Sequence, residues 1–563
     1  MRAKVIFLIS FVCLLTLGLS IYAPHIDRLA QNNPWLARFI SYSSPGSDDG
    51  SDLAADQGTL ERVYVTIKGN DPVHGLSFQG MNRLGQTDSL AMEPSLPAVF
   101  LAGDPERFDA QAEEGETVPN ATIEQRGYSA RIADQKSYKI RLQPGTLWHN
   151  QEVLNLNKHA FDYTRVRNKL SYDLLRLIPD LVSMDTRFVQ LFVKDTTNPP
   201  QPGQFVDYGL FTHVEQPNRD FLKRVGLDPD GYLYKAVQFE FYRYPELLRN
   251  RSDPLYDKAA FETVLGIGGR EYHEKLIAML EEVNDESKDF DEVFHKHFDQ
   301  DNFLTWIAVN LIMGNLDTTG NNFYLYSSRF TDKWYFLPWD YDKAWNFDWQ
   351  WGYDAAGIHP AREGLSLYWG WPLARRFFEN PDHVEALNEK MAELSQIITE
   401  ERARALLEEY YPVVKPMATR LPDVQLLPED IERFDEEYYA LAKFPAQSLE
   451  KYYANLEKPM PVFMGGPWIE ADRMTFTWGQ SFDLQGDELF YDLQISTAPD
   501  FSNVVREYGG LQVYEMTMEP LDPGVYYWRI IVRDSKGHEQ VAFESFINDE
   551  LRFYHGVKQF TLE

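Results

Sequence analysis

Cysteine is almost absent from this chain of 563 residues, in which Cys13 is the single example. One cysteine excludes a disulfide framework, a zinc site with several cysteine ligands and a CxxC redox pair. Cys13 has no small residue directly before it, as a lipoprotein signal would require, and it lies in the most apolar stretch of the chain. We therefore interpret it as a residue of a membrane segment.

Positive charge is scarce as well, because 54 Lys and Arg residues stand against 86 Asp and Glu, a formal net charge of −32. This charge repels a phosphate backbone, so we expect no nucleic-acid partner. A few basic side chains and a bridging cation still suffice to hold phosphate locally. The chain is 44% hydrophobic and 14% aromatic, which excludes general disorder.

Long hydrophobic runs are limited to one, at residues 5–23, and nothing later offers a second membrane span. Arg2 and Lys4 precede this run, which is about long enough to cross a bilayer. Cleavage at its end would leave Pro24 at the new terminus, so we favour an uncleaved signal anchor over residues 1–24. We expect a membrane-anchored protein with extracytoplasmic domains in the cell envelope, or a secreted protein if the segment is cleaved.

Several catalytic motifs are also missing. The sequence contains no GxxxxGK or GxGxxG phosphate loop and no GxSxG elbow. Its 12 histidines are scattered without the HExxH spacing of a zinc protease. Paired carboxylates occur everywhere in so acidic a chain, so they do not indicate a glycosidase.

The rest of the sequence divides into a linker, a large α+β domain and a smaller all-β domain. Ser, Gly and Asp are frequent in residues 25–60, which is typical of a solvated linker. Residues 61–457 show strand patterns, then helical patterns, a hairpin and more helices, as expected for a two-lobed α+β domain. Short, regularly spaced strands over residues 458–550 predict an immunoglobulin- or fibronectin-like sandwich, followed by a tail at 551–563.

Alternating apolar residues predict strands, and spacings of three and four predict helices. These patterns place strands at 62–69, 137–142, 321–326 and 333–338, and helices at 166–177, 301–312 and 380–456. Residues 217–312 have helical patterns throughout. In the C-terminal domain, the phrases YDLQISTAPDFS and LDPGVYYWRI resemble a fibronectin type III module with Trp478, Tyr491 and Trp528 in or near its core.

Residues 314–345 are the stretch most indicative of chemistry. Asp317 follows a helix, Asn322 comes five residues later at the start of a strand, and Asp340 follows the paired strand. Protein kinases have this arrangement, in which the first Asp accepts the hydroxyl proton while the Asn and the second Asp hold Mg²⁺. Asp and Asn in turns also make helix caps and Asx-turns, and Asp342 is an alternative to Asp340.

Five phrases, taken in order, resemble the CotH-type spore coat protein kinases. They are RGYSARIADQKSYKIRL (126–142), VRNKLSYDLLRL (166–177), YGLFTHVEQPNRDFL (208–222), DNFLTWIAVNLIMGNLDTTGNNFYLY (301–326) and KWYFLPWDYDKAW (333–345). The resemblance covers residues 61–350 and leaves the helical extension 380–456 outside. It implies a kinase-like domain that uses ATP, with Asp317 catalytic and with Asn322 and Asp340 as metal ligands.

The resemblance also implies a nucleotide-binding lysine on the strand at 137–142. Lys136 and Lys139 point to opposite faces of such a strand, so both are candidates. We favour Lys136, because Tyr138 and Ile140 share its face and indicate the core. Lys139 would then face outward.

Two further residues are candidates for nucleotide binding. Arg126 is able to reach phosphate as a fork-shaped donor, or to pair with a surface acid. Glu215 begins a connector to Pro217 whose backbone would contact adenine. Tyr128 and Gln135 depart from the family pattern, and this departure would weaken phosphate binding.

We therefore expect ATP- and Mg²⁺-dependent phosphoryl transfer to Ser or Thr hydroxyls of a protein partner in the envelope. The first alternative is a non-catalytic envelope or surface assembly protein that keeps the fold as a binding platform. The second is transfer to another acceptor, such as a wall glycan. The presence of Asp317, Asn322 and Asp340 together favours an enzyme over a binding platform.

Overall fold

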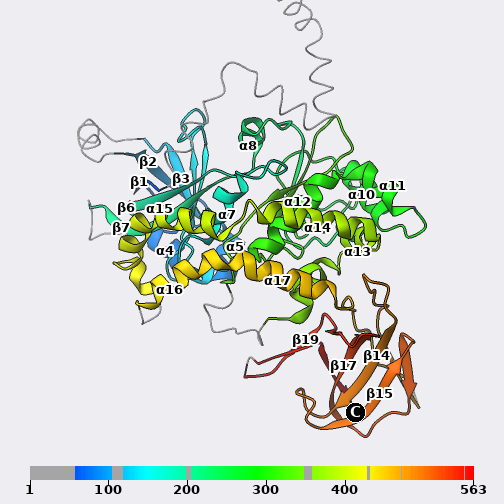
Figure 1. Cartoon of the computed structure of the whole chain (residues 1–563). Helices are drawn as coiled ribbons and strands as arrows, with labels where there is room; N and C mark the ends of the chain where they lie inside the picture. The colour runs from blue at the N-terminus through cyan, green and yellow to red at the C-terminus, as the bar shows by residue number, and fades with distance from the viewer. Residues whose placement is uncertain are drawn as a thin grey trace, which may run out of the picture.

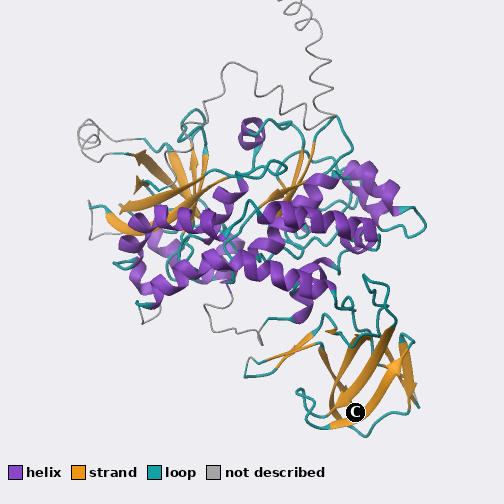
Figure 2. Ribbon diagram, viewed as in Figure 1, coloured by secondary structure: helices purple, strands orange, loops and turns teal. Residues whose placement is uncertain are grey.

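The computed structural model describes residues 58–103, 118–197, 204–347, 358–427, 431–470, 472–550 and 552–563. It is a mixed α+β structure with a β-barrel, a helical part built around a second sheet, and a C-terminal all-β part (Figures 1 and 2). The expected α+β class and all-β C-terminal region are thus confirmed. The expected anchor at 1–24 lies outside the described residues. Among the described helices, none combines the length and apolarity needed to cross a membrane.

The barrel closes in the order β1-β2-β3-β4-β5-β7-β6, with one parallel pair between β1 and β6. Its strands are β1 (Leu60–Ile67), β2 (Ser95–Ala102), β3 (Ala121–Gln125), β4 (Tyr138–Leu142), β5 (Val153–Asn157), β6 (Thr186–Asp195) and β7 (Val206–Glu215). Alternation sets which side chains fill it. On β4, Tyr138, Ile140 and Leu142 are buried in the barrel core, while Lys139 faces outward.

Three helices accompany the barrel strands. They are α4 (Phe78–Arg83), α5 (Gln86–Met92) and α7 (Arg167–Leu175). The last confirms the helix expected at 166–177, and every residue in it is buried. Within it Lys169 pairs with Asp173 at 2.8 Å, which compensates two buried charges.

The helical part surrounds an antiparallel sheet in the order β11-β10-β8-β9. Its strands are β8 (Tyr232–Ala236), β9 (Leu265–Ile267), β10 (Phe323–Ser327) and β11 (Tyr335–Pro338). The remaining helices are α8 (Arg219–Arg224), α9 (Lys258–Glu262), α10 (Glu274–Val283), α11 (Phe290–His297), α12 (Gln300–Met313), α13 (Pro372–Phe378), α14 (Pro381–Ser395), α15 (Glu400–Ala418), α16 (Arg433–Ala440) and α17 (Phe444–Leu456). Of these, α15 packs against β7 and α7 beside the barrel (Figure 1). The expectation of helices alone over 217–312 was wrong, because β8 and β9 interrupt them.

The C-terminal part has a three-stranded sheet, β12-β13-β16, and a larger sheet, β15-β14-β17-β18, to which β21 adds by pairing with β17. The strands are β12 (Trp468–Glu470), β13 (Arg473–Thr477), β14 (Leu489–Ser496), β15 (Val504–Leu511), β16 (Glu515–Met518), β17 (Gly524–Asp534), β18 (Glu539–Val541), β19 (Ser545–Ile547), β20 (Phe553–His555) and β21 (Val557–Leu562). Trp478, Tyr491 and Trp528 lie in its core, as expected.

The residues expected to form a tail at 551–563 belong to this all-β part. β21 pairs with β17 over six residue pairs, from Gly524 opposite Leu562 to Arg529 opposite Val557. Pairing satisfies backbone groups of β17 that would otherwise face solvent at a sheet edge.

The fibronectin type III resemblance stays a prediction. Figure 1 places this part beside the C-terminal end of α17, and Trp369 of the helical part stacks on Phe482 at the start of the all-β part.

Candidate functional site

Helix α12 delivers the loop that carries Asp317. It begins at the N-cap Asp299, whose side chain accepts a hydrogen bond from the backbone N–H of Asn302, and it is buried on all sides. It ends at Gly314, which has φ +58° and would place a Cβ 2.3 Å from the ring of Phe444. Only glycine combines this backbone with so close a neighbour. The end of the helix is therefore fixed three residues before Asp317.

Asp317 is held by its neighbours on both sides. The amide Nδ2 of Asn322 donates a hydrogen bond to Asp317 Oδ2 at 2.9 Å, and the ammonium of Lys343 lies 3.3 Å from the same oxygen. Asn322 itself has φ +59°, in the left-handed region that Asn tolerates better than most residues. Because its Nδ2 faces Asp317, its Oδ1 is left to point elsewhere.

Asp340 reaches the same place through the hairpin of β10 and β11. Phe323 pairs with Pro338 at the open end of this hairpin, so Asn322 and Asp340 emerge together. The backbone N–H of Asp340 donates to the hydroxyl of Tyr172 on α7 at 3.0 Å. Like Asn322, Asp340 has a positive φ, +58°. Paired left-handed residues of this kind are typical of functional sites.

Burial raises the pKa of Asp340 to about 6, and the neighbouring Asp342 adds to this effect. Arg126, Lys235 and His159 act in the opposite direction. A carboxylate in such a position has a high affinity for a cation, which would replace the water it has lost.

One cavity of about 500 Å³ brings most of the candidates together. Its walls come from the barrel and from the helical part, and its volume is in the range of small-molecule sites. The candidates that line it are Asp317, Asn322, Asp340, Arg126 and Lys139. The structure thus assembles five of the seven residues singled out in the sequence.

Lys136 lies elsewhere, although we favoured it. Its ammonium donates to the backbone carbonyl of Arg131 at 2.7 Å, and it lines a separate cavity of about 830 Å³. The alternation on β4 is as expected, but the outer face of this strand meets the 500 Å³ cavity. Lys139 is on that face and pairs with Glu124 at 3.3 Å. Position therefore favours Lys139 over Lys136, and its role in nucleotide binding stays a prediction.

Glu215 is also directed away from this cavity. Its buried carboxylate accepts a hydrogen bond from Arg224 Nε at 2.8 Å and another from the backbone N–H of Asp185 at 3.1 Å. The next residue, Gln216, lines the cavity and donates from Nε2 to the hydroxyl of Tyr324 at 3.2 Å. The connector therefore reaches the cavity one residue later than we expected.

Sequence reasoning missed Lys235 and Tyr324, which line this cavity together with Gln216 of the expected connector. Lys235 lies on β8, in the region where the patterns indicated only helices. The cross-strand pairing of Lys235 with Tyr324 brings it to the site, and such pairing has no local signal in sequence. Asp342, considered as an alternative to Asp340, lines the same cavity with its side chain 40% exposed.

The oxygen atoms at this site fit Mg²⁺. Within the described part of the chain, the carboxylate of Asp340 accepts no hydrogen bond, and neither does Oδ1 of Asn322. Carboxylate and amide oxygens are hard ligands of the type Mg²⁺ prefers. Asp317 differs, because Asn322 and Lys343 already contact it, so it is better suited to orient a hydroxyl.

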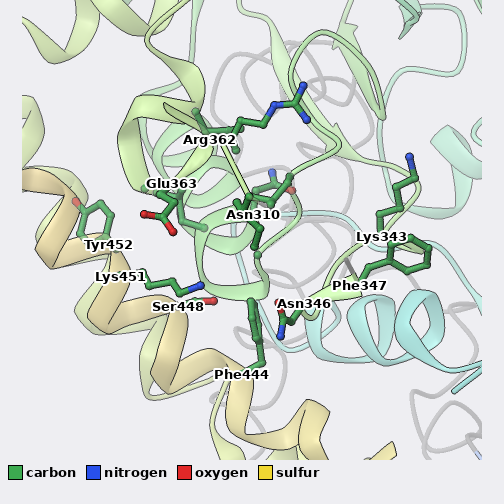
Figure 3. A pocket seen from close by; sticks show the side chains of 16 residues that line it. Asn310, Lys343, Asn346, Phe347, Arg362, Glu363, Phe444, Ser448, Lys451 and Tyr452 are labelled. Atoms are coloured by element: carbon green, nitrogen blue, oxygen red, sulfur yellow. The ribbon is translucent and has the colours of Figure 1, made fainter. Parts of the chain in front are cut away.

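A smaller cavity of about 50 Å³ is lined in part by Gly314 and Leu316, which precede Asp317 (Figure 3). Figure 3 shows Phe444, Ser448 and Lys451 entering it from α17, while Lys343 and Phe347 lie opposite. Lys343 lines both this cavity and the 500 Å³ cavity. The smaller cavity has too little volume for a nucleotide.

Comparison with known proteins places this geometry in a family. The family model described as CotH kinase protein matches residues 123–451, which is more than half of the chain. The chain belongs to the CotH kinase family. The match begins later than the resemblance we identified, and it continues past residue 350 through α14, α15 and α16 to residue 451 within α17.

A curated relative agrees with this assignment. The inner spore coat protein H of Bacillus subtilis (strain 168) is 25% identical over 319 residues, which cover 56% of this chain and 81% of that protein. In this CotH-family chain, the 500 Å³ cavity and all three acid and amide candidates fall within the matched region.

Proposed function

We propose that this CotH-family protein transfers the γ-phosphoryl group of ATP, with Mg²⁺, to Ser or Thr hydroxyls of a protein partner in the cell envelope or coat. The observation that carries the proposal is one cavity that joins Asp317, the free oxygens of Asn322 and Asp340, and several cations. Membership of a kinase-like family and the spore coat relative support the reaction class and the location.

Each residue has a distinct task in this proposal. Asp317, fixed by Asn322 and Lys343, orients the acceptor hydroxyl and takes its proton. Asn322 Oδ1 and Asp340 hold the metal, which when bound neutralises charge on the phosphates. The barrel and the helical part act as the two lobes of a kinase-like domain, with the nucleotide between them. Catalysis then depends on positioning and electrostatics, as in other phosphoryl transfers.

The experiment compares the full chain with Asp340→Asn and with Asp332→Asn, a change of an exposed acid outside the cavity. Melting temperature is measured with Mg²⁺, with ATP and with both, because a ligand specific for the native state raises it. We expect a shift that needs both ligands, persists in the Asp332 variant and disappears in the Asp340 variant. Transfer of the γ-phosphate to added Ser- and Thr-containing proteins is then measured with the same three proteins. Absence of any shift at millimolar ATP would remove the kinase proposal.

A binding role for the C-terminal part is the second candidate. Trp468 and Ile469 on β12 are 64% and 49% exposed, and exposed aromatic residues are frequent at contact surfaces. This role needs no nucleotide. A chain that binds neither ATP nor Mg²⁺ would leave it as the leading function.

A further inference from the structure

Two cations face Asp340 from opposite sides of the 500 Å³ cavity. Arg126 follows β3 on the barrel side, and Lys235 lies on β8 in the sheet of the helical part. Asp340 interacts favourably with both charges, while the two cations repel each other. They thus lie near a common point without forming an ion pair with Asp340.

The sheet fixes the direction of Lys235. Tyr324 on β10 is its cross-strand partner, and Asn322 precedes Tyr324 by two residues. Side chains two apart on a strand, and directly paired ones, share a face of the sheet. Lys235 and Tyr324 therefore share the face that lines the cavity, which Asn322 lines from just before the strand, and the ring of Trp339 lies 6.0 Å from the Lys235 ammonium.

These two cations differ from the other basic residues of the cavity. Lys139 and Arg141 share Glu124, at 3.3 and 3.2 Å, and Lys343 pairs with Asp317. By contrast, across the described ranges, Arg126 and Lys235 make no side-chain hydrogen bond and no ion pair. Burial lowers the pKa of each. Both side chains are half-buried, so each cation has lost part of its water without gaining an ion-pair partner, and an anionic ligand would compensate for that loss.

We propose that Lys235 and Arg126 clamp the phosphate chain of a nucleoside triphosphate from the two sides of the cavity, with Lys235 as a phosphate-positioning residue. The proposal rests on the nucleotide site inferred above. A polyphosphate carries enough charge to satisfy both cations and a metal on Asp340 at once. Arg126 offers a planar fork and Lys235 a compact charge, a combination suited to phosphate oxygens.

The test measures dissociation constants of ATP, ADP, AMP and inorganic tripolyphosphate, each with Mg²⁺, for the full chain and its variants. The variants are Lys235→Met, which keeps the packing of the stem, Lys235→Ala, Lys235→Arg and Arg126→Ala, with the exposed Lys223→Ala as control. Apo melting temperatures confirm that each variant is folded. Loss of a charge-assisted contact predicts that Lys235→Met weakens ATP about tenfold or more.

The dependence on phosphate number separates a phosphate contact from a structural role. We expect the loss in Lys235→Met to be largest for ATP and tripolyphosphate and within about twofold for AMP, with partial recovery in Lys235→Arg. Equal losses for ATP and AMP, or unchanged ATP affinity in both Lys235→Met and Lys235→Ala, would overturn the clamp while leaving the kinase proposal. Binding of tripolyphosphate through Lys235 without binding of ATP would overturn the nucleotide clamp together with the kinase proposal. A chain that binds neither overturns both.

Discussion

Asn322 donates a hydrogen bond from Nδ2 to Oδ2 of Asp317, at 2.9 Å. The contact joins the two ends of a short loop, and it couples the proposed base to a proposed metal ligand. Because the amide nitrogen faces Asp317, the amide oxygen is free for a cation. In the proposed site, a single side chain thus orients one carboxylate and offers an oxygen to the metal.

Asp317→Asn tests the role of the base. We expect transfer to fall by about 10²- to 10⁴-fold, the usual size of a general acid–base contribution, because Asn cannot accept the hydroxyl proton. Affinity for Mg²⁺ and ATP should change by less than about threefold, since Asp317 is not assigned to the metal. Parallel measurement of turnover and of ATP dissociation checks this. A large loss of ATP affinity would instead make Asp317 a metal ligand.

Asn322→Ala and Asn322→Gly form a matched pair that separates backbone strain from metal binding. Asn322 has φ +59°, so Ala adds backbone strain of about 1–2 kcal/mol, whereas Gly adopts this conformation freely. Both variants lose Oδ1. We expect weaker Mg²⁺ binding in both and a lower melting temperature mainly in the Ala variant. Normal Mg²⁺ affinity in Asn322→Gly would show that Oδ1 is not a ligand.

Local patterns predicted those parts of the fold that depend on near neighbours in sequence. The helix at 301–312 corresponds to α12, and the strands at 321–326 and 333–338 correspond to β10 and β11. The strands β8, β9 and β21 were missed because partners elsewhere in the chain stabilise them. Such pairing is a tertiary effect that local periodicity does not report.

The candidate site was likewise predicted only where its residues lie close together in sequence. Asp317, Asn322 and Asp340 were found because they lie close in sequence and flank one hairpin. The choice between Lys136 and Lys139 required knowing which face of β4 meets the cavity, which alternation alone does not give. Lys235 depends on its register opposite Tyr324, so no spacing in the sequence indicated it.

His213 provides a prediction on pH. It is fully buried on β7 against the edge of Trp148, and in the described structure neither ring nitrogen has a hydrogen-bond partner. Burial, together with the positive charge of Arg187, lowers its pKa from 6.5 to about 3. The unfolded chain therefore binds a proton that the native protein does not, between about pH 6.5 and 3. This stability is complete above pH 6.5 and is lost as the pH falls towards 3.

His213→Leu should remove this dependence. We expect the variant to be more stable than the parent at pH 7 by about 1–3 kcal/mol, because an unsatisfied buried polar ring is replaced by an apolar side chain. The difference should grow on acidification by up to about 1.4 kcal/mol per pH unit. Urea unfolding of both proteins from pH 7 to 4 measures it. A constant difference across this range would show that His213 is protonated in the native protein.

Gly314→Ala tests how α12 positions the Asp317 loop. The added methyl would lie 2.3 Å from Phe444, at a backbone with φ +58°, so strain and overpacking together should cost about 2–4 kcal/mol. Gly486→Ala is the matched control, because Gly486 has φ +77° with nothing within 4 Å and so adds backbone strain alone. The double variant Gly314→Ala/Phe444→Ala should lose less than the sum of its parts, since removing the ring relieves the clash. Thermal unfolding of these variants and of Phe444→Ala gives the four values, and equal losses at Gly314 and Gly486 would show that Phe444 does not constrain the end of the helix. Transfer should also fall in Gly314→Ala but not in Gly486→Ala, because only Gly314 lies three residues from Asp317.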